Sequence, residues 1–205
     1  MKTKFNTRVL TGTAMLAAVA TVLMYMEFPI PIMPAFIKLD VSELPALIAS
    51  FAYGPVAGIV VCLIKNLIKL PSTSTAAVGE LFNFVMGALF VGVAGMVYRF
   101  KKTRSGAILG AVLGALVMAI VSVPYNYFVV YPAYVVMYHL PLDAIIGMYQ
   151  AINPNVNGLL NCLLVFNLPF TFFKGMLDAV ICLAIYKPLS PILHGRNSGG
   201  KSVTA

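Results

Sequence analysis

An apolar stretch at residues 161–186, NCLLVFNLPFTFFKGMLDAVICLAIY, constrains this chain most. It is long enough to cross a bilayer, whose ~30 Å hydrocarbon core takes about 20 helical residues. Its interior nevertheless carries polar residues spaced i, i+4, i+7 and i+11, which share one face of a helix: Asn167, Thr171, Lys174 and Asp178. An ionised side chain in the middle of a membrane helix costs roughly 2.5–3.5 kcal/mol. We therefore expect this polar stripe to face other protein.

Two interpretations of the stripe stay open. Lys174 and Asp178 are one helical turn apart and could simply neutralise each other inside a helical bundle. Asn167 and Thr171 add hydrogen-bonding groups that the neutralisation of one lysine does not require. Their presence favours the second interpretation, in which the stripe lines a cavity for a polar ligand.

The composition places the whole chain in a membrane. Of its 205 residues 60% are hydrophobic and 10% charged, and the mean hydropathy is +0.94, far above that of soluble domains. We predict an all-α membrane protein, a six-transmembrane-helix bundle with both termini cytoplasmic. The predicted spans lie at about residues 8–27, 43–51, 56–70, 77–98, 107–130 and 161–186. Residues 1–190 form one six-helix transmembrane substrate-binding domain, and residues 191–205 a flexible basic cytoplasmic tail.

The net charge of +8 follows the membrane topology and does not indicate nucleic-acid binding. Basic residues cluster between apolar runs, as the positive-inside rule predicts for cytoplasmic ends. The clusters are Lys2, Lys4 and Arg8; Arg99, Lys101, Lys102 and Arg104; and Lys187, Arg196 and Lys201. The first apolar run has no convincing cleavage site, so we expect it to be the first span and not a signal peptide.

The connections between spans also carry information. Residues 28–45 hold four prolines and cannot form a continuous helix, so we expect this apolar loop to fold over the mouth of the bundle. Ser42 is a predicted helix N-cap. Lys65 and Lys69, one turn apart near the outer end of their helix, are expected to snorkel towards the membrane surface. Residues 131–160 are expected to form an external connection with a partial helix.

Polar residues of the later spans gather with aromatic residues towards the outer half of the membrane. They are Lys65, Asn66, Glu80, Asn83, Asn126, Asn167 and Thr171, close in sequence to Tyr125, Tyr127, Phe170, Phe172 and Phe173. Amides and hydroxyls interleaved with aromatic rings suit a flat, hydrogen-bonding heterocycle better than a bare ion. A hydrogen-bond network between helices is the alternative.

Catalytic and metal-binding patterns are poor. The two histidines are far apart, HExxH and GxSxG are absent, and the three cysteines lie in apolar segments without ligand spacing. Residues 195–202 match GxxxxGK[ST], but a membrane helix precedes them where a phosphate loop needs a strand. We therefore expect neither an enzyme nor a metal site.

Two segments resemble a known family. FIKLDVSELPALIASFAYGPVAGIVVCLIKNLIK at residues 36–69 and NLPFTFFKG at residues 167–175 are similar to the riboflavin-binding substrate-specific subunit (S component) of energy-coupling-factor (ECF) vitamin transporters. The resemblance covers nearly the whole chain. It implies a multi-pass protein of the bacterial plasma membrane that captures riboflavin, as its transported substrate and not as a cofactor, from outside. It also implies partners, namely a transmembrane coupling subunit and two ATP-binding subunits.

The resemblance implies roles for individual residues. Asn126, Thr171 and Lys174 fall where the family contacts the flavin, and residues 36–40 fall in its lid; relatives are expected to carry asparagine at position 171. The predicted substrate-binding residues are Phe36, Lys38, Leu39, Asp40, Asn83, Tyr125, Asn126, Asn167, Thr171 and Lys174. Ala14 and Ala18, a small-xxx-small pair, are the predicted contact with the coupling subunit. The alternatives are an S component for another vitamin or for flavin mononucleotide (FMN), and a structural membrane subunit or a membrane enzyme with an unrecognised site.

Overall fold

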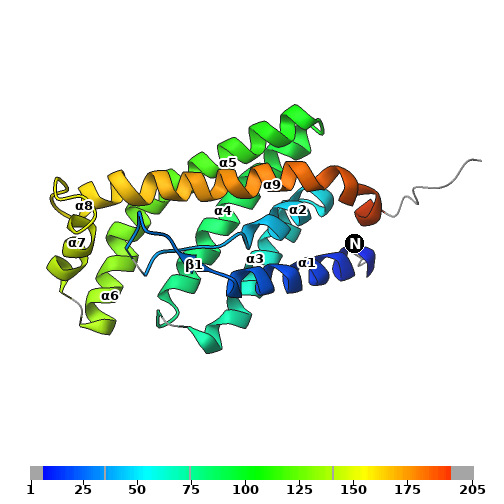
Figure 1. Ribbon diagram of the computed structural model, residues 1–205. Helices are drawn as coiled ribbons and strands as arrows, with labels where there is room; N and C mark the ends of the chain where they lie inside the picture. Colours follow the sequence, from blue (N-terminus) through cyan, green and yellow to red (C-terminus); the bar gives the residue numbers. More distant parts are fainter. Residues whose placement is uncertain (1–6, 35, 74, 140, 195–205) are drawn as a thin grey trace, which may run out of the picture.

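The chain is almost entirely helical in a computed structural model, which describes residues 7–34, 36–73, 75–139 and 141–194. The α-helices are α1 (Thr7–Tyr25), α2 (Glu43–Tyr53), α3 (Pro55–Lys69), α4 (Val78–Phe100), α5 (Arg104–Tyr125), α6 (Tyr131–Tyr138), α7 (Leu142–Gln150), α8 (Leu159–Cys162) and α9 (Leu168–His194). A 3-10 turn, η1 (Leu70–Ser72), follows α3, and two π-helical turns, η2 (Asn126–Val130) and η3 (Leu163–Asn167), interrupt longer helices. Two short strands, β1 (Phe28–Pro29) and β2 (Lys38–Leu39), complete the elements (Figure 1).

Within the described residues, five segments are long and apolar enough to cross a membrane: Thr7–Tyr25, Pro55–Ser72, Val78–Phe100, Arg104–Tyr138 and Leu159–Tyr186. Large apolar side chains cover the outer surface, with Met15 66% exposed and Phe128 73% exposed. A surface of this kind is stable against lipid and would aggregate in water. The structure therefore confirms the all-α membrane class.

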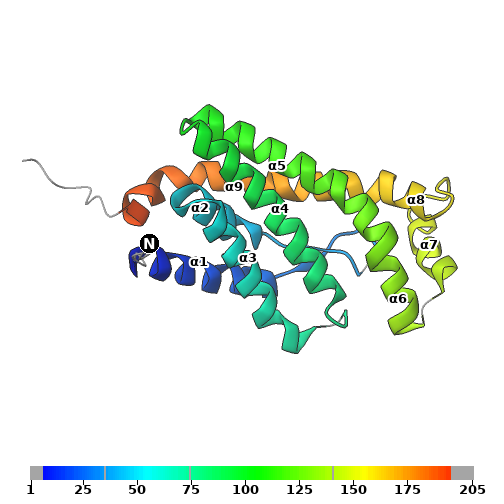
Figure 2. The ribbon, with the colours of Figure 1, turned by 180° about the vertical axis from the view of Figure 1, so that it is seen from behind.

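Helix α2 differs from the other predicted spans. Its 11 residues reach about 16 Å at 1.5 Å per residue, which is roughly half of a bilayer core. Every residue from Glu43 to Phe51 is buried, because α1, α3, α4 and α9 surround the helix (Figure 2). Gly54, at a φ of 105°, and Pro55 then separate α2 from α3. α2 is thus the centre of the bundle.

The loop between α1 and α2 folds back over the bundle. Strands β1 and β2 pair antiparallel, with Phe28 opposite Leu39 and Pro29 opposite Lys38. This pairing holds the proline-rich segment across the middle of the molecule (Figure 1). This arrangement agrees with the expectation that the loop covers the mouth of the bundle.

The predicted end of the fifth span, at about residue 130, was wrong. The helix does not stop at residue 130 but continues through η2 into α6, so that one segment runs over Arg104–Tyr138. The π-helical turn accommodates Pro132 at the start of α6. The external connection is correspondingly shorter and contains α7.

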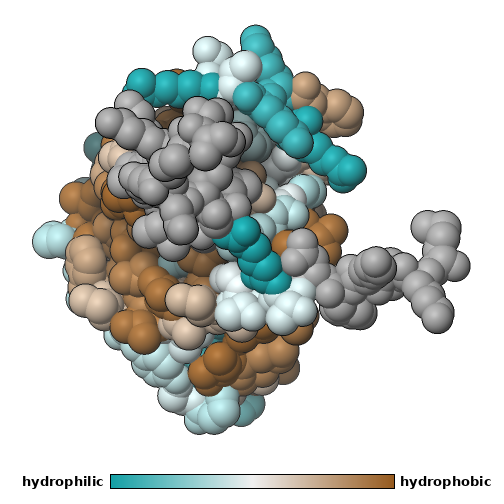
Figure 3. Space-filling view, turned by 90° about the vertical axis from the view of Figure 1, so that its right-hand side faces the viewer, coloured by the Kyte–Doolittle hydropathy of each residue, from teal (hydrophilic) through white to brown (hydrophobic). Residues whose placement is uncertain are grey.

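The start of α1 and the end of α9 lie at the same end of the bundle, which also holds the turn from α4 to α5 (Figure 1). Seen from that end, hydrophilic groups gather on parts of the face and hydrophobic groups cover the flanks (Figure 3). Helix α9 extends to His194, beyond the predicted domain boundary at residue 190. The remaining tail and the GxxxxGK[ST] match, residues 195–205, lie outside the described residues.

Candidate functional site

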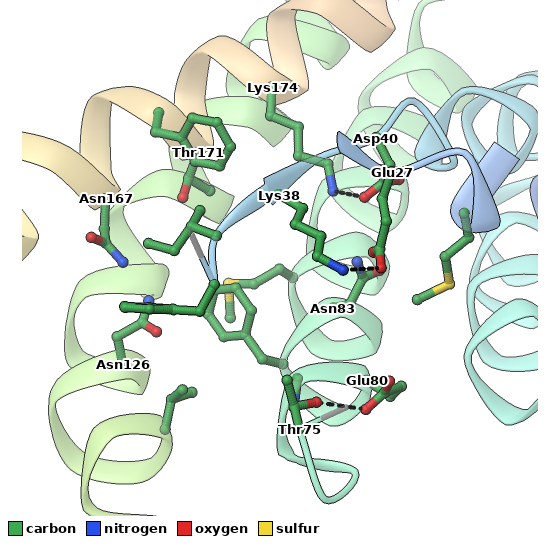
Figure 4. A pocket seen from close by; sticks show the side chains of 18 of the residues that line it. Glu27, Lys38, Asp40, Thr75, Glu80, Asn83, Asn126, Asn167, Thr171 and Lys174 are labelled. Atoms are coloured by element: carbon green, nitrogen blue, oxygen red, sulfur yellow. Dashed lines mark hydrogen bonds and ion pairs between the residues drawn. The ribbon is translucent and has the colours of Figure 1, made fainter. Parts of the chain in front are cut away.

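A cavity opens between the first loop and helices α3, α4, α5 and α9 (Figure 4). Its volume of about 170 Å³ far exceeds the ~15 Å³ that one water molecule needs. The polar stripe on α9 therefore faces an open space.

Eight of the ten predicted substrate-binding residues line the cavity: Phe36, Lys38, Asp40, Asn83, Asn126, Asn167, Thr171 and Lys174. The other two do not. Leu39 is buried in β2, and Tyr125 packs against Phe82 with ring centroids 5.8 Å apart. Which of these residues touch a ligand stays a prediction.

The two π-helical turns carry two of the three asparagines that line the cavity, Asn126 and Asn167, and α4 carries the third, Asn83. In each turn a backbone N–H bonds to the carbonyl five residues back, Tyr131 to Asn126 and Leu168 to Leu163. A proline follows immediately in both cases, at positions 132 and 169. A proline ring clashes with the carbonyl four residues earlier, and a wider turn relieves that clash. Such π-turns are frequent at functional sites.

A buried ion-pair network forms the floor of the cavity. Lys174 Nζ lies 2.8 Å from Asp40 Oδ2 and 3.1 Å from Glu43 Oε2. Lys65 Nζ lies 2.7 Å from Glu43 Oε1 and 2.5 Å from the Ser42 hydroxyl. Because Lys65 is fully buried, the prediction that it snorkels was wrong. Ser42 makes no side-chain cap either, since its hydroxyl accepts from Lys65.

A second ion-pair group ties the loop to the bundle. Glu27 Oε2 lies 2.6 Å from Lys69 Nζ, and Glu27 Oε1 lies 2.9 Å from Lys38 Nζ. The snorkelling prediction therefore fails for Lys69 as well, because its ammonium turns inwards to Glu27. Partial burial alone would raise the pKa of Glu27, but hydrogen bonds from Lys69 and Lys38 lower it below its usual value.

Asp40 is nearly inaccessible to solvent, with 5% exposure. Burial opposes its charge, yet attraction to Lys174 and Lys65 holds the pKa of this carboxyl well below its usual range. Asp40 also accepts from the Ser42 backbone N–H at 2.8 Å. The loop therefore places a stable anion next to the lysine of α9.

Asp178 does not neutralise Lys174 in the way that the simpler interpretation of the stripe requires. Lys174 pairs with Asp40 and Glu43, and neither oxygen of Asp178 has a hydrogen-bond partner in the described part of the chain. The pairing partners of Lys174 thus come from other elements. In this same part of the chain, no three His, Cys, Asp or Glu side chains are arranged to hold a metal ion.

Sequence reasoning missed several residues at the cavity. Glu27, Glu43, Tyr131 and Tyr134 line it but were not predicted as site residues. Tyr131 and Tyr134 were expected to belong to an external connection. The spacing of Tyr131 and Tyr134 three residues apart was an available sign that the helix continues.

Ala14 and Ala18 lie on the outer face of α1, exposed away from the bundle. The buried face of the same helix carries Thr13, Ala17 and Ala20. These two alanines are therefore accessible to a neighbouring membrane protein, and they line no part of the cavity.

Several known proteins are similar to this chain. The riboflavin transporter RibU of Staphylococcus aureus (strain TCH60) is 35% identical over 188 residues, 92% of this chain and 93% of that protein. The riboflavin transporter FmnP of Bacillus subtilis (strain 168) is 32% identical over 188 residues, 90% of this chain and 93% of that protein.

A solved structure has the same fold. It is described as the S component of a bacterial ECF transporter, and it matches with a TM-score of 0.71 and 34% identity over 92% of this chain and 98% of that one. A model of the family "ECF transporter, substrate-specific component" matches residues 8–186. The two relatives named above are each more than 30% identical to this chain over more than nine-tenths of their own length, which supports the family match. The chain is therefore a multi-pass membrane protein that belongs to the substrate-specific (S) components of ECF transporters, and it is not an enzyme.

Proposed function

We propose that this S component binds riboflavin and delivers it across the membrane. The observation that carries the proposal is the cavity, which is lined by the amides of Asn126 and Asn167, the ammonium of Lys174, and apolar and aromatic side chains. Relatives that are named riboflavin transporters support the same ligand.

The chemistry of the cavity matches that of a flavin. The pyrimidine edge of the isoalloxazine ring offers carbonyl acceptors and one N–H donor. Asn126 and Asn167 can supply donors and acceptors, and Lys174 can donate to a carbonyl or a ring nitrogen. Asn126 Nδ2 already donates to Ser122 O at 2.8 Å, so its carbonyl oxygen and second N–H stay available.

The ribityl chain would meet the loop. Lys38, Asp40 and Asn83 line the cavity there and suit the ribityl hydroxyls, and Asp40 lies 2.8 Å from Lys174. The apolar residues Phe36, Met86 and Met118 line it as well and suit the ring faces. Residues 36–40 would then act as the lid of the site.

The chain crosses the membrane six times in this proposal, with both termini cytoplasmic. Helix α2 is the second and shortest of these crossings, and the loop that leads into it covers the bundle mouth. In support, Glu43 at the start of α2 pairs with Lys65 near the end of α3, and Tyr53 at its end lies against Gly12 near the start of α1. Residues 1–190 form one substrate-binding domain, followed by a cytoplasmic tail.

The proposed partners are a transmembrane coupling subunit and two ATP-binding subunits, with Ala14 and Ala18 at the coupling contact. Replacing both alanines with leucine should abolish ATP-driven uptake in reconstituted vesicles and leave riboflavin affinity within twofold. Ala144→Leu, an exposed alanine on α7, is the control and should change neither. Uptake that survives the double substitution would remove this contact from the proposal.

Ligand binding is tested on the detergent-purified protein. We expect flavin absorption bands to co-purify, and riboflavin to quench its fluorescence on titration into the ligand-free protein. Lys174→Ala should weaken binding more than tenfold, whereas Lys102→Ala, exposed beyond the end of α4, should not. Tighter binding of FMN or of another vitamin in competition would replace riboflavin as the substrate. No binding across the panel would favour a structural subunit.

A further inference from the structure

Three side chains at one wall of the cavity form a closed ring of hydrogen bonds. The Tyr149 hydroxyl donates to Asn167 Oδ1 at 2.7 Å, and Asn167 Nδ2 donates to the Tyr131 hydroxyl at 3.4 Å. The two tyrosine hydroxyls bond to each other. The three residues come from α7, η3 and α6, so the ring exists only in the folded chain.

The proton count gives this ring one direction. In this structure the amide oxygen of Asn167 faces the Tyr149 hydroxyl at 2.7 Å, so Tyr149 donates this bond. A phenol has a single proton, so Tyr149 has none left for Tyr131. Tyr131 therefore donates to Tyr149, and its own oxygen accepts from the Asn167 amide.

The ring is shielded from water. Tyr149 is 0% exposed, Tyr131 1% and Asn167 6%. Burial raises the pKa of Tyr149 above its usual value, so the phenol keeps the proton that it donates. Phe36 from the first loop packs edge-on against both tyrosines, with ring centroids 6.4 Å from Tyr131 and 6.3 Å from Tyr149. Turning the amide over would reverse the direction of every hydrogen bond and leave each group paired, so in either direction the ring holds the Asn167 side chain at this place.

We propose that Tyr131 and Tyr149 are positioning residues that hold the Asn167 amide in place, so that its free N–H and oxygen lone pair are presented to a ligand at this wall of the cavity. Asn167 and Tyr131 line the cavity, whereas Tyr149 lies behind them. The ring leaves Asn167 one N–H and one oxygen lone pair for the ligand. The inference rests on the proposed function, because the matching pattern is the donor and acceptor edge of the flavin pyrimidine.

A double-mutant cycle on riboflavin affinity tests the inference. Tyr149→Phe removes one hydroxyl and keeps the ring that packs against Phe36. We expect its Kd for riboflavin to rise roughly tenfold, the size of one lost hydrogen bond. In the Asn167→Ala background the same substitution should change Kd less than twofold, because there is no amide left to position. Tyr127→Phe, a partly exposed tyrosine of η2, is the matched control and should bind as the wild type does.

Failure of the positioning role and failure of the proposed function would give different results. An unchanged Kd in Tyr149→Phe, or an equal loss with and without Asn167, would overturn the positioning role while riboflavin binding itself stands. Wild-type protein that binds no riboflavin would overturn the proposed function instead. The melting temperature of each ligand-free variant shows whether it folds. If Tyr149→Phe does not fold, the same double-mutant cycle is measured with Tyr131→Phe in its place.

Discussion

Lys174 on α9 and Asp40 in the first loop form an ion pair of 2.8 Å across 134 positions of sequence. The pair joins the loop that covers the cavity to the helix that forms its floor. Since Asp40 is almost fully buried, the pair is protected from screening by solvent. The position of the loop thus depends on a charge in the binding site.

Asp40→Asn should release this connection. The amide keeps the volume of the side chain but not its charge, and a hydrogen bond between charged groups contributes about 1.5–3 kcal/mol. We expect riboflavin to dissociate roughly tenfold faster, measured by stopped-flow fluorescence. Asp143→Asn, an exposed acid on α7, is the control. A dissociation rate equal to that of the wild type would separate loop closure from the ion pair.

Lys65→Met should lower stability strongly. Lys65 is fully buried between Ser42 and Glu43, and methionine keeps most of its apolar volume. Glu43 then loses one of two cationic partners inside the bundle, and breaking a buried pair costs about 3–5 kcal/mol. Thermal unfolding of the ligand-free protein in detergent measures the loss, with the exposed Lys101→Met as control. A melting temperature close to that of the wild type would argue against a structural role for the pair.

Gly114→Ala should weaken the contact between α4 and α5. A β-carbon at this position would lie 2.5 Å from the Phe90 backbone oxygen of α4, so the helices would have to move apart. We expect a loss of about 1–3 kcal/mol in the free energy of unfolding. Gly147→Ala on α7 is the matched control, because the new methyl group meets no atom within 4 Å. Equal stability of the two variants would contradict close packing here.

Acid should open the loop before it unfolds the bundle. The folded pKa of Glu27 is below its usual 4.5, so its ion pairs contribute fully above about pH 4.5 and are lost as pH falls through the folded pKa. The pKa of Asp40 is depressed as well, so the Lys174 pair persists into this range. Riboflavin should dissociate faster below about pH 4.5, whereas Glu27→Gln should show the faster rate already at pH 7. A wild-type rate that does not vary with pH would exclude Glu27 as the acid-sensitive anchor.

The sequence by itself determined the membrane class, most of the helix positions and four cavity residues of α9 and its π-helical turn. Those features are local, because a periodicity of 3.6 residues decides which side chains share a face. The tertiary structure alone decided that Lys65 and Lys69 turn inwards, that Glu43 joins Lys174, and that Tyr149 reaches Asn167. Each of those contacts joins separate elements, and periodicity within one helix carries no information about the depth or direction of its neighbours. The continuation of α5 through a proline into α6 was likewise a tertiary outcome, since a π-helical turn and packing against α7 and the first loop compensate for the lost hydrogen bond.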